Sequence, residues 1–217
     1  TWELSLAARV KEVQAHTSAE SIYGFWKTMS EEGIEVYNTL LSDSFQFDKD
    51  SYNSLQEGWH SWKNPIARAA LFFLLSTASD SGLVSSGKFN TSHLQALSYS
   101  RVRNFKKPDN LHFNYNPDNL IDQLSASQDS DWLVVPAAQY DYNLFDYGKL
   151  WGKEETAVNH KHLFEFWKSS NIKTVLVYNY HPQLLKIYPR NNIIMITEHG
   201  ARTNHERMCK EIIIVKS

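Results

Sequence analysis

The sequence is poor in cysteine and has no long apolar run, and each absence narrows the classes of protein that fit it. Cys209 is the only cysteine in 217 residues, which excludes an internal disulfide framework and a cysteine-rich zinc site and fits a reducing compartment. No apolar run approaches the roughly 18–20 residues that a membrane span needs, and no secretion-signal pattern opens the chain. We therefore expect a soluble, intracellular protein without membrane contact. Whether it belongs to the cytoplasm, the nucleus or a virion stays open, as does whether a segment precedes Thr1.

The chain also lacks a strong net charge. Its formal charge is −2 and its pI is about 6.5, so nucleic-acid binding would have to come from a local patch of charge. A hydrophobic content of 42% and a charged content of 21% are typical of an ordinary globular protein. At 217 residues the chain is long enough for a full core, and we expect a single domain over residues 1–217.

Short apolar runs alternate with segments of helical periodicity. Pro65 begins the clearest helix, because proline suits a first turn and residues 66–75 are apolar nearly all round. This alternation, followed by two closing strands, predicts an α/β protein with a mostly parallel sheet, helices on both faces and an antiparallel edge strand. Val134 and Leu176 should be buried at the centre of the sheet. The strands are expected near Val13, Leu111, Trp132, Thr174, Ile193 and Ile212.

The segment that follows the apolar run 132–135 has almost no reactive group. Ligand chemistry in α/β sheets sits just past the carboxyl ends of the strands, which here means residues 137–140. Ala137, Ala138 and Gln139 offer no carboxylate, nucleophile or metal ligand, and Tyr140 alone carries a phenol. The segment is either a structural crossover or a reactive site whose reactive groups are gone.

Two further patterns that could carry chemistry are incomplete. Residues 82–88 spell most of a phosphate-binding loop, but Phe89 stands where a Ser or Thr would bind magnesium, and a helix is expected where a strand should precede the loop. His160 and His162 lack an accompanying carboxylate–histidine pattern, so we expect a solvated helix start there. No metal site is predicted.

The sequence changes character at about residues 79–110, where small and polar residues dominate and helical periodicity weakens. We interpret this stretch as a loop-rich insertion. Within it, residues 101–107 place four positive charges around Phe105. Two interpretations stay open: an ordinary solvated loop, or a surface that contacts phosphates, with Phe105 available for packing or base stacking.

Several segments stand in an order that resembles one enzyme family. They are residues 68–74, 82, 87–90, 131–135, 140–141, 145–148, 175–179 and 211–213. Along almost its whole length the chain is similar to the Dam-type (D12 class) DNA N6-adenine methyltransferases. The resemblance implies a Rossmann-like methyltransferase fold, in which the insertion at 79–110 corresponds to the family's target-recognition region.

The resemblance also implies that the catalytic groups are missing. In the family an Asp and the following Pro-Pro hold the amino group of the target adenine, and a Tyr stacks on the flipped base. Ala137, Ala138 and Gln139 stand at the first three positions, and only Tyr140 is kept. This degenerate loop implies that no residue is catalytic.

The cofactor positions implied by the resemblance are degenerate as well. They are Glu3, Ala7, Arg9 and Thr17. The glycines of the S-adenosylmethionine loop are lost, Arg9 is bulky where the backbone must approach the cofactor, and Thr17 replaces the acid that grips the ribose. We therefore expect no cofactor.

The function that follows is a catalytically inactive adenine-methyltransferase-like protein, retained for DNA binding or as the non-catalytic, structural partner in a complex. Two alternatives stay open. One is a catalytically active DNA N6-adenine methyltransferase that is specific for a DNA site and uses S-adenosylmethionine. The other is a protein–protein interaction module without nucleic acid. A protein partner or an oligomer is expected for this protein. If DNA is bound, the contacts should come from the segment that resembles the family's DNA-facing region, namely Lys88, Asn90, Arg101, Arg103, Lys106 and Lys107.

Overall fold

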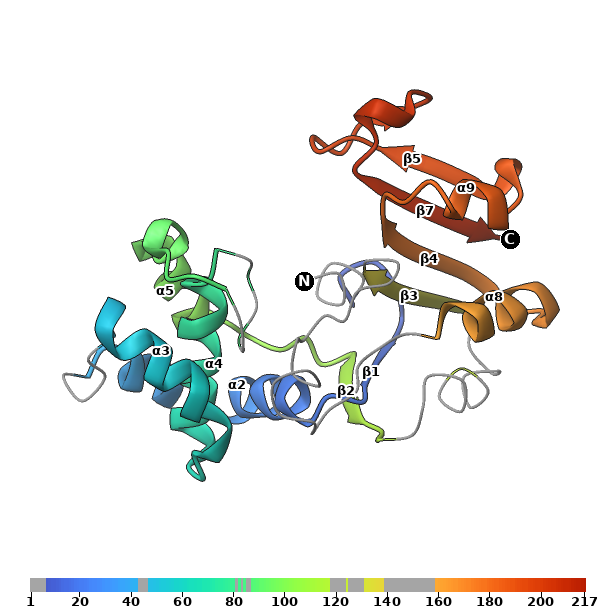
Figure 1. Cartoon of the computed structure of the whole chain (residues 1–217). Coiled ribbons are helices and arrows are strands. Elements are labelled where there is room, and N and C mark those ends of the chain that lie inside the picture. Colours follow the sequence, from blue (N-terminus) through green and yellow to red (C-terminus); the bar gives the residue numbers. More distant parts are fainter. Residues whose placement is uncertain are drawn as a thin grey trace. The chain divides into compact units, whose positions relative to one another are not determined.

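The computed structural model describes residues 7–42, 47–80, 82, 84, 87–117, 124, 131–138 and 159–217. These residues divide into two compact units. Unit 1 contains the described residues up to Pro117, and unit 2 contains those from Leu124 onward (Figure 1). The single domain expected over residues 1–217 stays a prediction.

Two long helices, α2 (Glu20–Leu40) and α4 (Pro65–Thr77), form the centre of unit 1. α4 confirms the helix predicted from Pro65. The side chain of Asn64 caps it by accepting hydrogen bonds from the backbone N–H groups of Ile66 and Ala67, at 2.9 and 3.1 Å. Phe72 of α4 stacks on Phe25 of α2, with ring centroids 4.9 Å apart. The buried residues of α4 are Ala69, Ala70, Leu71, Leu74 and Leu75.

Two helices of unit 1 were not predicted. α3 (Lys49–Gly58), followed by the short 3-10 helix η1 (Trp59–Ser61), starts at a capping box between Asp48 and Ser51. α5 (Ala96–Arg103), preceded by η2 (Thr91–His93), lies inside the segment interpreted as loop-rich. Val102 of α5 is only 5% exposed. The segment therefore supplies part of the core of unit 1.

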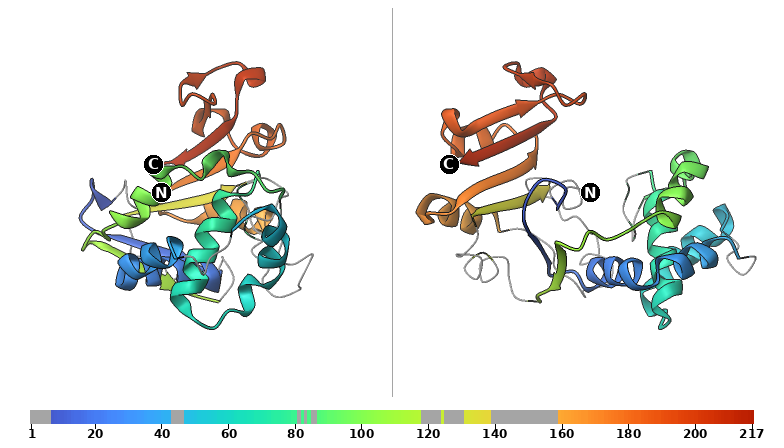
Figure 2. Two further views of the ribbon diagram at one scale, coloured as in Figure 1. Left: turned by 90° about the vertical axis from the view of Figure 1, so that its left-hand side faces the viewer. Right: turned by 180° about the vertical axis from the view of Figure 1, so that it is seen from behind.

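Strands β1 (Val13–Thr17) and β2 (Leu111–Tyr115) form a two-stranded parallel sheet in unit 1, with Val13 paired to Leu111 and Thr17 to Tyr115. One face of this pair packs on α2, since Phe113 stacks on Trp26 at 5.7 Å between ring centroids. Figure 2 shows the two strands side by side in both views. Both strands lie where the sequence predicted them.

The elements of unit 2 are β3 (Trp132–Ala138), α8 (His160–Ser169), β4 (Lys173–Asn179), α9 (Leu184–Ile187), η3 (Arg190–Asn192), β5 (Ile193–Ile196), β6 (Arg202–Thr203), η4 (Glu206–Met208) and β7 (Glu211–Lys216). The strands form a five-stranded sheet with the order β3-β4-β7-β5-β6. Its core includes Leu176, Tyr178, Ile212 and Ile214 from the strands and Leu163 and Trp167 from α8. Lys216 closes the C-terminal end of α8 by donating hydrogen bonds to the carbonyls of Trp167, Lys168 and Ser170.

The prediction of one mostly parallel Rossmann-like sheet is wrong. The described strands form two sheets, and only the β3–β4 pair of the larger sheet is parallel, while β4–β7, β5–β7 and β5–β6 are antiparallel. The last strand, β7, lies between β4 and β5, and the antiparallel strand at the edge of the described sheet is β6. The short connection between β5 and β6 allows their antiparallel pairing, whereas a parallel pair needs a long crossover. Apolar runs locate strands without giving their direction.

β3 also differs from the buried central strand that its apolar run suggested. It is the outermost strand of the described sheet, Trp132 is 48% exposed and Val134 is only half-buried. Pro136 lies within β3 rather than ending it. A proline has no N–H to donate and therefore fits an edge strand. The predicted burial of Leu176, in contrast, is confirmed, since it is fully buried. No helix in the described part of the chain is long and apolar enough to span a membrane.

Candidate nucleic-acid interface

Residues 87–107 of unit 1 carry five Lys or Arg residues and no Asp or Glu. The whole chain, in contrast, has a net charge of −2. The stretch runs from the turn after α4 through η2 and α5 to the residues before β2. We call it the η2–α5 surface. Its local excess of positive charge could attract an anion.

The start of the η2–α5 surface is held against the end of α4 by backbone hydrogen bonds. Ser79 and Phe89 form an isolated antiparallel bridge. The N–H of Lys88 donates to the carboxylate of Asp80 at 2.9 Å, and the N–H of Asn90 donates to the carbonyl of Ala78 at 2.7 Å. Gly87 has a φ of 99°, which a residue with a side chain rarely adopts. The Lys88 ammonium stays exposed.

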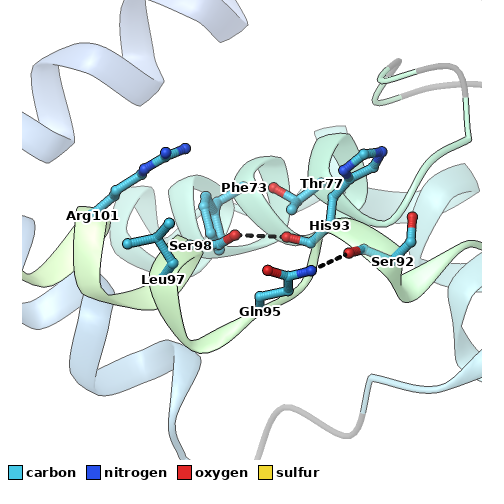
Figure 3. Close-up of a pocket in the computed structure, with 8 residues that line it drawn as sticks. All are labelled: Phe73, Thr77, Ser92, His93, Gln95, Leu97, Ser98 and Arg101. Atoms are coloured by element: carbon cyan, nitrogen blue, oxygen red, sulfur yellow. Dashed lines mark hydrogen bonds between the residues drawn. The ribbon is translucent and has the colours of Figure 1, made fainter.

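A pocket of about 370 Å³ opens between α4, η2 and α5. Phe73 and Thr77, four residues apart, lie on one face of α4, and Leu97 and Arg101 lie on one face of α5. In Figure 3, Phe73 lies between Arg101 on one side and His93 on the other. The described lining contains no carboxylate and consists of Phe73, Thr77, Ser92, His93, Gln95, Leu97, Ser98 and Arg101.

Two hydrogen bonds shape the wall of this pocket. The hydroxyl of Ser98 donates to the carbonyl of His93 at 2.6 Å, and the side-chain amide of Gln95 donates to the carbonyl of Ser92 at 3.0 Å. Asn90 holds the lining residue Ser92 in place, because its side-chain oxygen accepts the N–H of Ser92 at 2.9 Å. These bonds connect η2 to the start of α5. The Arg101 guanidinium stays exposed beside the apolar lining residues Phe73 and Leu97.

The six residues predicted to contact DNA do not form one patch. Arg101 lines the pocket, whereas Arg103, two positions on, points about 200° away around the helix. The Arg103 guanidinium lies 5.8 Å from the ring centroid of Tyr37. Lys106 is exposed, but the ammonium of Lys107 donates to the carbonyls of Pro108, at 3.2 Å, and Leu111, at 2.7 Å. Lys107 therefore has a structural role, and Asn90 acts mainly as a cap of η2.

Half of the predicted catalytic segment is described. Ala137 is buried inside β3, and Ala138 is the last residue of the strand, next to a register shift in the pairing with β4. The two alanines thus belong to the strand and not to a loop after it. Gln139 and Tyr140 lie outside the described residues.

The predicted cofactor positions that are described have local structural roles. Ala7 is buried and Arg9 is exposed in a turn. The side-chain amide of Asn110 holds this turn by donating to the carbonyls of Ala7 and Val10, at 2.8 and 2.9 Å. The hydroxyl of Thr17 accepts the N–H of Ala19 at 3.2 Å. Glu3 lies outside the described residues.

Unit 2 offers a second hollow at the end of β4 and the start of β7, lined by Asn179, Tyr180, Cys209, Lys210 and Glu211. Burial raises the pKa of the Cys209 thiol, which keeps the group protonated and unreactive. Burial, followed by the hydrogen bond to Glu206, raises the pKa of Tyr180. Neither group is thereby activated. In the described part of the chain, no cluster of three or more His, Cys, Asp or Glu could hold a metal ion.

Sequence reasoning missed the pocket residues Phe73, His93, Gln95 and Leu97. Phe73 looks like any core residue of an apolar helix, and the other three belong to a stretch without clear periodicity. The absence of acids between Asp80 and Asp109 is the one sequence signal that could have marked the region. No known protein family matches this sequence, and no curated protein matches it either. The Dam-type resemblance therefore stays a prediction.

Proposed function

We propose that this chain is a non-catalytic DNA-binding protein that contacts the phosphate backbone through the η2–α5 surface. The observation that carries the proposal is the charge of this surface: five cations and no carboxylate in residues 87–107 of a chain with net charge −2. A local excess of positive charge attracts phosphates even when the net charge of the whole protein is negative. The resemblance inferred from the sequence implies the same role, since it likens residues 79–110 to the target-recognition region of the Dam-type family.

Four cations of the surface have exposed side chains: Lys88, Arg101, Arg103 and Lys106. Arg103 lies on the opposite side of α5 from Arg101, so we expect about three phosphates to be neutralised. Counterion release then gives a log–log dependence of affinity on salt with a slope of roughly −3. Phosphate contacts carry no base information. We therefore expect similar affinity for different duplex sequences.

The test is a gel-shift titration at several salt concentrations with wild type and the double variant R101A/R103A. Because Arg103 lies on the opposite side of α5 from Arg101, the double variant should lose the Arg101 contact alone. The slope should flatten by about one, and all sequences should bind more weakly alike. The matched control K161A/K168A removes two exposed cations of α8 in unit 2 and should leave the slope unchanged. An unchanged slope in R101A/R103A would move the site elsewhere. If no DNA binds at low salt, the remaining role is to support a protein partner, and the acidic net charge favours that role.

A further inference from the structure

The pocket of the η2–α5 surface has an apolar wall that phosphate contacts do not use. Leu97 is 59% exposed on its rim, and Phe73 lines it from α4. The ring of Phe73 is oriented by a T-shaped contact with Tyr99, at 6.0 Å between centroids. An exposed leucine beside an aromatic ring provides a flat apolar contact surface within an otherwise polar, cationic face.

We infer that this pocket takes one unpaired nucleotide of single-stranded DNA, with the base against Phe73 and Leu97 and the adjoining phosphates on Arg101 and His93. This inference rests on the proposed function. A nucleotide strand alternates a flat base with negative phosphates, and the pocket presents Phe73 between two groups that can donate hydrogen bonds to an anion (Figure 3). The absence of carboxylates from the described lining removes the main source of repulsion.

The size of the pocket favours an unpaired nucleotide over a duplex. About 370 Å³ lies near the lower end of small-molecule pockets, which measure roughly 300–1,000 Å³. A base in a duplex is stacked on both faces, so it cannot reach an aromatic wall without leaving the stack. In a single strand every base has a free face, and such stacking tolerates all sequences.

The experiment compares fluorescence-anisotropy binding of a labelled single strand of about 12 nucleotides with that of the duplex of the same sequence. The variants are Leu97→Ala, Arg101→Ala and the matched control Leu41→Ala, which removes an equally exposed leucine (57%) just after α2. Because both leucines are largely exposed, neither truncation should endanger the fold.

We expect wild type to prefer the single strand, and Leu97→Ala to weaken single-strand affinity about fivefold without changing duplex affinity. Arg101→Ala should weaken both, and Leu41→Ala neither. If Leu97→Ala leaves single-strand affinity unchanged while Arg101→Ala weakens both, the pocket inference is overturned and the proposed function stands. If neither DNA binds at low salt, the proposed function fails. Displacement of the single strand by free thymidine monophosphate at similar concentration would overturn the inference of a strand-binding site.

Discussion

Lys107 and Lys106 are neighbouring cations with different surroundings. The Lys107 ammonium donates to two backbone carbonyls, and one of them belongs to Leu111, which begins β2 and is fully buried. We expect Lys107→Met to lower the free energy of unfolding by about 1–2 kcal/mol, because it leaves the Leu111 carbonyl without its charged donor. Urea denaturation followed by circular dichroism measures this loss.

The matched control is Lys106→Met, which removes an exposed cation. It should change the unfolding free energy by no more than about 0.5 kcal/mol, while reducing the salt slope of DNA binding by about one. Equal stability losses in both variants would contradict the structural role of Lys107. The two lysines thus separate folding from phosphate contact within one segment.

At the scale of an element, helix α3 depends on the capping box at its first turn. The N–H and then the hydroxyl of Ser51 hold the pKa of the Asp48 carboxyl below its usual value of 3.8. A carboxyl whose pKa is lower in the folded state contributes stability above its unfolded pKa, and loses that contribution as the pH falls through the folded pKa. We expect Asp48→Asn, which keeps an oxygen acceptor but does not titrate, to lose less stability than wild type between neutral pH and about pH 3.

The measurement is the urea midpoint of wild type and Asp48→Asn at the two pH values. All other carboxyl groups are present in both proteins, so the difference between their two acid-induced losses of stability measures the contribution of Asp48 alone. Asp50→Asn is the control, because it removes an exposed carboxyl of the same turn that takes no part in the capping box. An acid loss in Asp48→Asn as large as in wild type would show that the cap is not formed in solution.

At the scale of the whole molecule, we expect no binding of S-adenosylmethionine up to about millimolar concentration. This limit corresponds to a free energy of binding weaker than about −4 kcal/mol. Ala7 is buried, the turn that contains Arg9 is held by Asn110, and the Thr17 hydroxyl accepts a backbone N–H. None of these groups is arranged to grip a ribose or a methionine. Isothermal titration calorimetry on the full chain tests this, and micromolar affinity would instead favour the active methyltransferase alternative.

Several elements could be predicted from the sequence because local patterns determine them. The helix from Pro65 follows from a proline at its first turn and an apolar run, and six strands lie where apolar runs placed them. α3 was missed because most of its residues are polar and only Tyr52 is buried. α5 was missed because its eight residues carry little periodicity, and packing of Val102 against the core stabilises it instead.

By itself the sequence determined six of the extended segments, the helix from Pro65 and the position of the acid-free stretch, because these depend on neighbouring residues along the chain. Only the tertiary structure decided that β7 enters the sheet antiparallel between β4 and β5, since strand direction depends on connections and not on composition. It also separated Arg101 from Lys107. Both are cations in one short segment, but one lines a pocket with Phe73 and the other is engaged by backbone carbonyls. Such differences arise from contacts between residues distant in the sequence, which no local pattern records.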